Sequence, residues 1–272
     1  MYTITRVLNN NALLVSDDEN NEVILLGKGA GFGRKTGEKL SDSGGAREFR
    51  LSKEDSRREM IGTEAGIGPL YLEIAGSVIE KAECVFSGFS SDILLPLADH
   101  IAFAAKRNQD GIYIPNPYIP DIKVLYPKEF SIAWDCRDLI LERAGYEVTE
   151  DEACFIALHI HSGLSNEAVS STIHYTQVIS SCMKLIEKRT GRLDHSSPVY
   201  ARIESHIYYL IDRARNGEPV NVNLNRYMAT TYPRAYSIAQ DVLGFVAKQL
   251  ETETDPMEAG YLAVNIERLL PD

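Results

Sequence analysis

The spacing of apolar residues divides the chain into a short β-type part and a longer helical part. In residues 2–8, 12–17 and 22–27, apolar and β-branched residues are separated by turns rich in Asn and Asp, and residues 48–52 could form a fourth strand. This pattern predicts a small antiparallel all-β unit. Four short strands bury little apolar surface, so we expect the unit to be stabilised by dimerisation.

Beyond residue 67, apolar residues recur every three to four positions, which is typical of packed helices. Thr149 lies three residues before Glu152, a capping-box pattern that predicts a helix start. Gly111 and Gly217 mark helix ends. The clearest predicted helices are residues 71–86, 93–107, 131–145 and 149–160.

The helical part contains an internal repeat with an offset of 106 residues, which aligns His100 with His206 and Tyr126-Pro127 with Tyr232-Pro233. Of the 61 positions in 100–160, 15 are identical in the second copy, whereas composition alone gives about four. The fold expected is a small antiparallel all-β domain followed by two homologous all-α bundles of four or five helices each. We expect the domains at residues 1–56, 67–171 and 172–272, with a polar linker at 53–69 and a flexible break at 41–46.

Charge separates the two parts in the same way. The chain has a net charge of −11, but its first 53 residues carry +1 and the remainder −12. Only the N-terminal part is therefore a candidate for nucleic-acid contact. The chain shows neither a signal-peptide pattern nor a run of 18 apolar residues, which predicts a cytoplasmic protein without membrane insertion. Reduced, isolated thiols and no metal site are expected at Cys84, Cys136, Cys154 and Cys182.

A glycine-rich segment, GKGAGFGRKTG at 27–37, carries groups suited to RNA. Its glycines would let a ligand approach the backbone, although turns and bulges are the favoured explanation when the glycines are taken without the surrounding motifs. Lys28 and Arg34 can contact phosphates, Phe32 can stack on an unpaired base, and Asn11 can bond base edges. A dinucleotide site is disfavoured, because Phe32 replaces the third glycine of GxGxxG and no helix follows.

The motifs RVLNNN (6–11) and GKGAGFGRKTG, followed by a duplicated domain with DHIAFAAKR (99–107) and DEACFIALHI (151–160), resemble the transcriptional antiterminators of the BglG/SacY type along the whole chain. The resemblance implies a dimeric domain that binds a hairpin in the leader RNA of a sugar-utilisation transcript and blocks the overlapping terminator. It places RNA contacts at Arg6, Asn11, Gly27, Lys28 and Phe32, with Asn9, Asn10, Gly29 and Arg34 beside them.

The same resemblance implies that the two repeats are phosphotransferase-system regulation domains, phosphorylated on histidine by the phosphocarrier protein and the sugar permease. A neutral imidazole can attack a phosphoryl group. The targets implied are His100, His159 and His206, while Asn265 stands at the fourth position and cannot carry phosphate. The second copy is therefore expected to accept phosphate on His206 or not at all. A lone histidine is more often a packed, hydrogen-bonded residue than a phosphate acceptor, and we interpret His161, His174 and His195 as ordinary surface or core residues.

Arg107 and Arg213 lie seven residues after His100 and His206, and are expected to hold their helices or to meet a phosphate from a neighbouring chain. Glu152 and Glu258 are interpreted as helix-start residues. The alternative function, a DNA-binding activator with the same regulatory domains, requires a helix-turn-helix where the pattern predicts strands. An enzyme is not expected, since no motif such as HExxH occurs, and neither catalytic residues nor a cofactor are expected.

Overall fold

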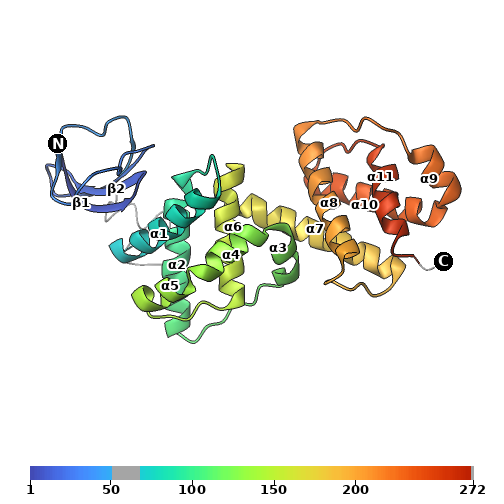
Figure 1. Cartoon of the computed structure of the whole chain (residues 1–272), viewed down its shortest axis with the longest axis horizontal. Coiled ribbons are helices and arrows are strands. Elements are labelled where there is room, and N and C mark those ends of the chain that lie inside the picture. The colour runs from blue at the N-terminus through green and yellow to red at the C-terminus, as the bar shows by residue number, and fades with distance from the viewer. Residues whose placement is uncertain (51–67, 271–272) are drawn as a thin grey trace. The chain divides into compact units, whose positions relative to one another are not determined.

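A computed structural model describes residues 1–50 and 68–270 of the chain (Figure 1). Residues 51 and 52 of the fourth predicted strand, and most of the predicted linker, lie outside the described residues. The chain forms two compact units, the first comprising Met1–Asn116 and Lys128–Val169 and the second comprising Pro117–Pro127 and Ser170–Asp272. Each unit is described by itself below.

The N-terminal part is an antiparallel sheet with strand order β4-β1-β2-β3-β5. The alternation of apolar residues located the three long strands, and the sheet also contains a two-residue strand that the pattern did not predict. A tight turn joins β1 to β2, because Asn9 pairs directly with Ala12. The strands are β1 (Tyr2–Asn9), β2 (Ala12–Ser16), β3 (Glu22–Leu26), β4 (Lys39–Leu40) and β5 (Arg47–Arg50).

Both faces of this sheet are buried at its centre. On one face Ile4, Leu13 and Leu25 pack with Ala46 in a small apolar core. Leu14 and Ile24 point to the opposite face, since side chains alternate along a strand, and they are buried too. This burial on both faces explains the continuous apolar runs in β2 and β3.

The helical part begins with helices that correspond to the first repeat (Figure 1). Thr149 caps α6 as predicted, and its side chain accepts the N–H of Glu152. The predicted helix at 131–145 is instead two helices that meet at Cys136. The first repeat therefore contains more helices than the four or five expected. They are α1 (Pro69–Val85), the short 3₁₀ helix η2 (Ser91–Ile93), α2 (Leu94–Gln109), α3 (Ile119–Leu125), α4 (Pro127–Asp135), α5 (Arg137–Ala144) and α6 (Glu150–Ser165).

The second repeat follows the first at the expected offset. Tyr126 ends α3 and Tyr232 ends α9 with nearly the same backbone angles, φ −126° and −131°. One helix, α10, replaces the pair α4 and α5. The helices are α7 (Val169–Thr190), α8 (Pro198–Asn216), α9 (Asn225–Thr231), α10 (Pro233–Leu250) and α11 (Glu258–Glu267).

The second unit also includes α3, although the sequence of this helix belongs to the first repeat. Within the unit the hydroxyl of Tyr200 on α8 donates to Asp121 on α3 at 3.3 Å, and the rings of Tyr126 and Tyr208 meet edge to face. Helices α7, α8, α10 and α11 enclose the main apolar core of the unit. None of the described helices combines the length and the apolar composition that spanning a lipid bilayer requires.

Candidate RNA-binding edge and histidine sites

Hydrogen bonds fasten the glycine-rich loop to the β1–β2 turn. The N–H of Gly27 donates to the carbonyl of Asn11 at 2.9 Å, and the N–H of Gly31 donates to that of Asn10 at 3.0 Å. The side-chain oxygen of Asn11 accepts the N–H of Gly29 at 2.8 Å. The two motifs that the sequence suggested for RNA contact therefore lie together, and Asn11 holds the loop.

Two glycines show why the loop needs this residue type. A Cβ at Gly31 would lie 2.1 Å from the carbonyl oxygen of Asn9, so the β1–β2 turn excludes any side chain there. Gly29 has φ of +75°, a conformation that costs an L-residue with a side chain. The glycines thus build consecutive turns, which is the alternative that the sequence left open.

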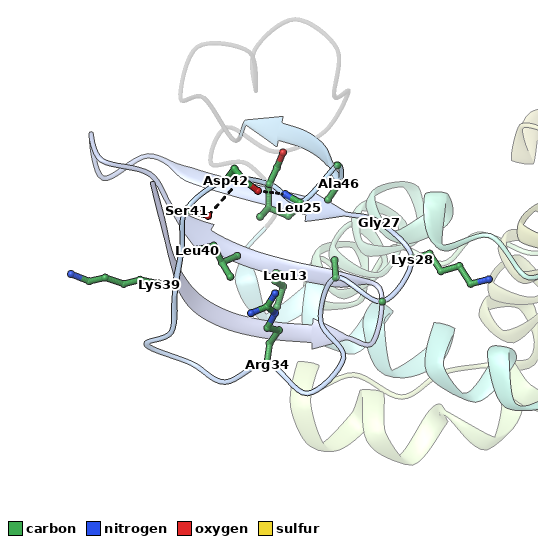
Figure 2. A pocket seen from close by; sticks show the side chains of 15 residues that line it. Leu13, Leu25, Gly27, Lys28, Arg34, Lys39, Leu40, Ser41, Asp42 and Ala46 are labelled. Atoms are coloured by element: carbon green, nitrogen blue, oxygen red, sulfur yellow. Dashed lines mark hydrogen bonds between the residues drawn. The ribbon is translucent and has the colours of Figure 1, made fainter.

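Cationic and aromatic groups project from this loop. The side chain of Phe32 is 74% exposed, far more than an apolar core residue. Lys28 and Arg34 are exposed on either side of it in sequence. They also line a pocket of about 410 Å³ between the loop and residues 39–46, and Figure 2 shows Lys28 and Lys39 extending in opposite directions. The predicted flexible break at 41–46 forms one wall of this pocket.

Other predicted RNA-contact residues are engaged within the first unit. The amide of Asn11 donates to Glu83 of α1 at 2.6 Å, and Arg6 forms an ion pair with Glu73 of the same helix. Asn9 is buried, and its side-chain oxygen accepts the N–H of Asn11. Asn11 and Asn9 therefore shape the site, while Asn10, Lys28, Phe32 and Arg34 are exposed at it.

In the first repeat, both predicted target histidines belong to one cluster. His100 on α2 and His159 on α6 have ring centroids 5.0 Å apart. Nε2 of His100 lies 3.2 Å from Oε2 of Glu152, and the Arg107 guanidinium donates to the other carboxylate oxygen at 2.6 Å. Arg107 also covers the ring of Phe103. Arg107 thus holds the carboxylate that faces His100, which fits the first of its two expected roles.

The second repeat builds the same cluster with one change. Nε2 of His206 lies 3.6 Å from Oε2 of Glu258, which Arg213 binds through two hydrogen bonds of 2.5 and 3.0 Å. Asn265 occupies the place of His159, and its amide nitrogen lies 3.1 Å from Nδ1 of His206. Four positions related by the 106-residue offset therefore converge in both copies.

The electrostatics of the two clusters follow from burial and from these partners. Burial tends to raise the pKa of Glu152, but hydrogen bonds and charge from His100 and Arg107 outweigh it and hold the pKa below its usual value. The same balance, with His206 and Arg213, lowers the pKa of Glu258. Both carboxylates are thus ionised near neutral pH.

His159 differs from the carboxylates. Desolvation lowers its pKa well below the usual value for histidine, and the nearby imidazole of His100, which would repel a second charge, acts in the same direction. Its Nδ1 atom is buried and has no hydrogen-bond partner among the described residues. His159 is therefore a neutral imidazole near pH 7.

Sequence reasoning missed the carboxylates of these clusters. Glu152 does lie in the first turn of α6, as interpreted, but its side chain contacts the target histidine. The signal was present, because histidine, arginine and glutamate are all identical between the copies. Among the histidines interpreted as ordinary surface or core residues, His161 contacts Glu129 at 3.0 Å and His195 stacks on Tyr200.

Comparison with known protein families identifies the domains that carry these sites. Residues 2–58 match the family model of the CAT RNA binding domain, and residues 77–163 and 180–269 each match that of the PRD domain. The chain belongs to the BglG family of transcription antiterminators. It is a regulatory RNA-binding protein rather than an enzyme, and the predicted order of one β-domain and two homologous helical domains is confirmed.

Relatives of this antiterminator match it along nearly the whole chain. The PtsGHI operon antiterminator of Bacillus subtilis is 32% identical over 98% of this chain and 97% of its own. Transcription antiterminator LicT of the same organism is 27% identical, covering 98% of both chains. The beta-glucoside operon antiterminator of Dickeya chrysanthemi is also 27% identical, over 98% of this chain and 96% of its own. A crystal structure of GlcT CAT-PRDI covers 61% of this chain and 99% of its own, at 38% identity and a TM-score of 0.40.

Proposed function

We propose that this antiterminator binds a hairpin in the leader RNA of a sugar-utilisation operon as a homodimer, and thereby prevents the overlapping terminator from forming. Phosphorylation of His100, His159 and His206 by the histidine phosphocarrier protein and a sugar permease regulates this binding. The names of the relatives, which refer to the ptsGHI and beta-glucoside operons, support a sugar operon as the target.

The observation that carries the RNA-binding proposal is the exposed Phe32 on a loop held rigid by the β1–β2 turn. An aromatic ring offers a stacking surface to an unpaired base, and flanking cations contact phosphates. Hairpin loops supply such unpaired bases, whereas an intact DNA duplex does not.

The phosphorylation proposal is supported by the twin clusters. Each places an imidazole beside a carboxylate that is itself held by an arginine. A phosphoryl group adds nearly two negative charges to a cluster that already contains an ionised carboxylate. The repulsion would disturb the packing of α2 on α6, or of α8 on α11. The resulting change of conformation would regulate RNA binding.

Stem-loop binding tests the RNA function. The full-length protein is used to select RNA ligands with internal loops from a randomised stem-loop pool. Its affinity for the selected RNA is then measured by gel shift. Phe32→Ala should lower the affinity by roughly 5- to 150-fold, since base–aromatic stacking is worth about 1–3 kcal/mol. Tyr227→Ala removes another exposed ring, from the second PRD domain, and should not change the affinity.

Two results would contradict the proposal. The first is equal loss of affinity in both variants. The second is tighter binding to a duplex DNA of the same sequence, which would support the DNA-binding activator instead. Sedimentation of the protein with and without RNA tests the homodimer, because a bound monomer is incompatible with it.

A further inference from the structure

The carboxylates of the two clusters determine which imidazole nitrogen carries the hydrogen. Nε2 of His100 faces Glu152 and Nε2 of His206 faces Glu258, at 3.2 and 3.6 Å. Neither contact has the geometry of a hydrogen bond. An ionised carboxylate nevertheless attracts an N–H and repels a nitrogen lone pair, so the hydrogen of a neutral imidazole belongs on Nε2. Nδ1 then keeps the lone pair and is the nitrogen able to attack phosphorus.

The copies differ at that nitrogen. The amide nitrogen of Asn265 lies 3.1 Å from Nδ1 of His206, in position to donate a hydrogen to its lone pair. In the first copy no described residue donates a hydrogen bond to Nδ1 of His100. The residue at the place of Asn265 is His159, whose own Nδ1 is buried without a partner. The lone pair is thus engaged in the second copy and open in the first.

We propose that Asn265 is a positioning residue whose amide hydrogen occupies the Nδ1 lone pair of His206. The second PRD domain therefore accepts a phosphoryl group on this histidine more slowly than the first accepts one on His100. This inference rests on the proposed regulation by phosphorylation and specifies its reacting atom. The product on His100 is the Nδ1-phosphohistidine.

The transfer balances with the groups present and one donor. The Nδ1 lone pair attacks the phosphorus of a donor phosphohistidine that is protonated on its second nitrogen. The donor P–N bond breaks, its electron pair returns to the donor ring, and that ring leaves as neutral imidazole. The new phosphoimidazolium on His100 keeps its hydrogen on Nε2, where Glu152 compensates the positive charge.

The experiment labels full-length protein with potassium phosphoramidate, a small phosphoryl donor that requires no protein partner and releases ammonia. The rate at each histidine is followed by mass spectrometry, and the isomer by antibodies specific for Nδ1- or Nε2-phosphohistidine. Asn265→Ala should raise the rate at His206 by roughly 3- to 10-fold, the value of one neutral hydrogen bond. Asn216→Ala removes an exposed amide from the end of α8 and should leave this rate unchanged.

A reciprocal variant and a spectroscopic measurement keep the test independent of any folding defect at position 265. His159→Asn introduces the amide into the first copy and should lower the rate at His100. Nitrogen-15 NMR of the unphosphorylated protein should show hydrogen on Nε2 of His206 and a shift of Nδ1 in Asn265→Ala.

Hydrogen on Nδ1 of His206, equal labelling of His100 and His206 in the parent protein, or labelling at Nε2 would overturn the inference. The phosphocarrier protein is then substituted for phosphoramidate. If it fails to label a protein that phosphoramidate labels as expected, the proposed regulation fails while the role of Asn265 stands.

Discussion

The first PRD domain has His159 and Ala98 at the positions where the second has Asn265 and Glu204. Both domains nevertheless keep the same histidine, glutamate and arginine in contact. The conserved contacts hold one geometry in two copies, while the two exchanged residues give each copy its own response to protons. A duplicated domain can therefore retain a binding geometry and still lose its functional symmetry.

The largest difference should appear when the buried carboxylates are removed. Glu152→Ala leaves the Arg107 side chain, only 8% exposed, without its partner, and should cost about 3–5 kcal/mol of unfolding free energy. Glu258→Ala should cost less, because the Arg213 side chain is 29% exposed and can turn to water. Hydrogen exchange on peptides from each domain measures the two costs separately. Equal costs would mean that arginine burial does not determine them.

The contacts of these carboxylates could not be predicted from the sequence. The three long strands and the Thr149 cap depend on local spacing, and the repeat shows as identities at one fixed offset, so these features could be predicted. Arg107, the partner of Glu152, lies 45 residues away in the sequence on another helix, and only the packing of the two helices brings the side chains together. The break at Cys136 was missed because 131–145 keeps a helical pattern through it. The grouping of α3 with the second unit likewise depends on contacts distant in sequence.

Acidification should weaken the first domain. The folded state holds His159 neutral with a lowered pKa, whereas the unfolded chain binds a proton near pH 6.5. The unfolded state therefore gains protons first, and stability falls as the pH drops below about 6.5, by at most about 1.4 kcal/mol per pH unit. His159→Asn should flatten this slope between pH 7.5 and 5.5. Hydrogen exchange at several pH values checks it, and an unchanged slope would assign it to another group.

The second domain should respond in the opposite direction. Glu204 is fully buried, and burial, helped by the negative charge of the nearby Asp121, raises its pKa to about 9. The folded state keeps this proton while the unfolded chain releases it near pH 4.5, so stability falls as the pH rises from 4.5 towards 9. The slope is again at most about 1.4 kcal/mol per pH unit.

Glu204→Gln is the matched test, because glutamine resembles the protonated form. The second domain of this variant should be as stable near pH 7 as near pH 4.5, whereas that of the parent protein loses stability over the same range. Glu152 and Glu258 have lowered pKa values in both domains and titrate below about pH 4.5, so they do not affect this window. Parallel slopes in the two domains of the parent protein would show that His159 and Glu204 do not control them.

The smallest expected effect concerns the start of α6. The Thr149 side chain accepts the N–H of Glu152, whereas its counterpart Asp255 accepts the N–H groups of Met257 and Val220 and so joins two segments. Thr149→Ala should cost about 1 kcal/mol, confined to α6, and Thr149→Ser should restore it. Because the same cap fixes the backbone of Glu152, the alanine variant should also slow phosphoryl transfer to His100 while leaving His206 unaffected. If stability falls but the rate at His100 does not, Arg107 alone suffices to hold the carboxylate in place.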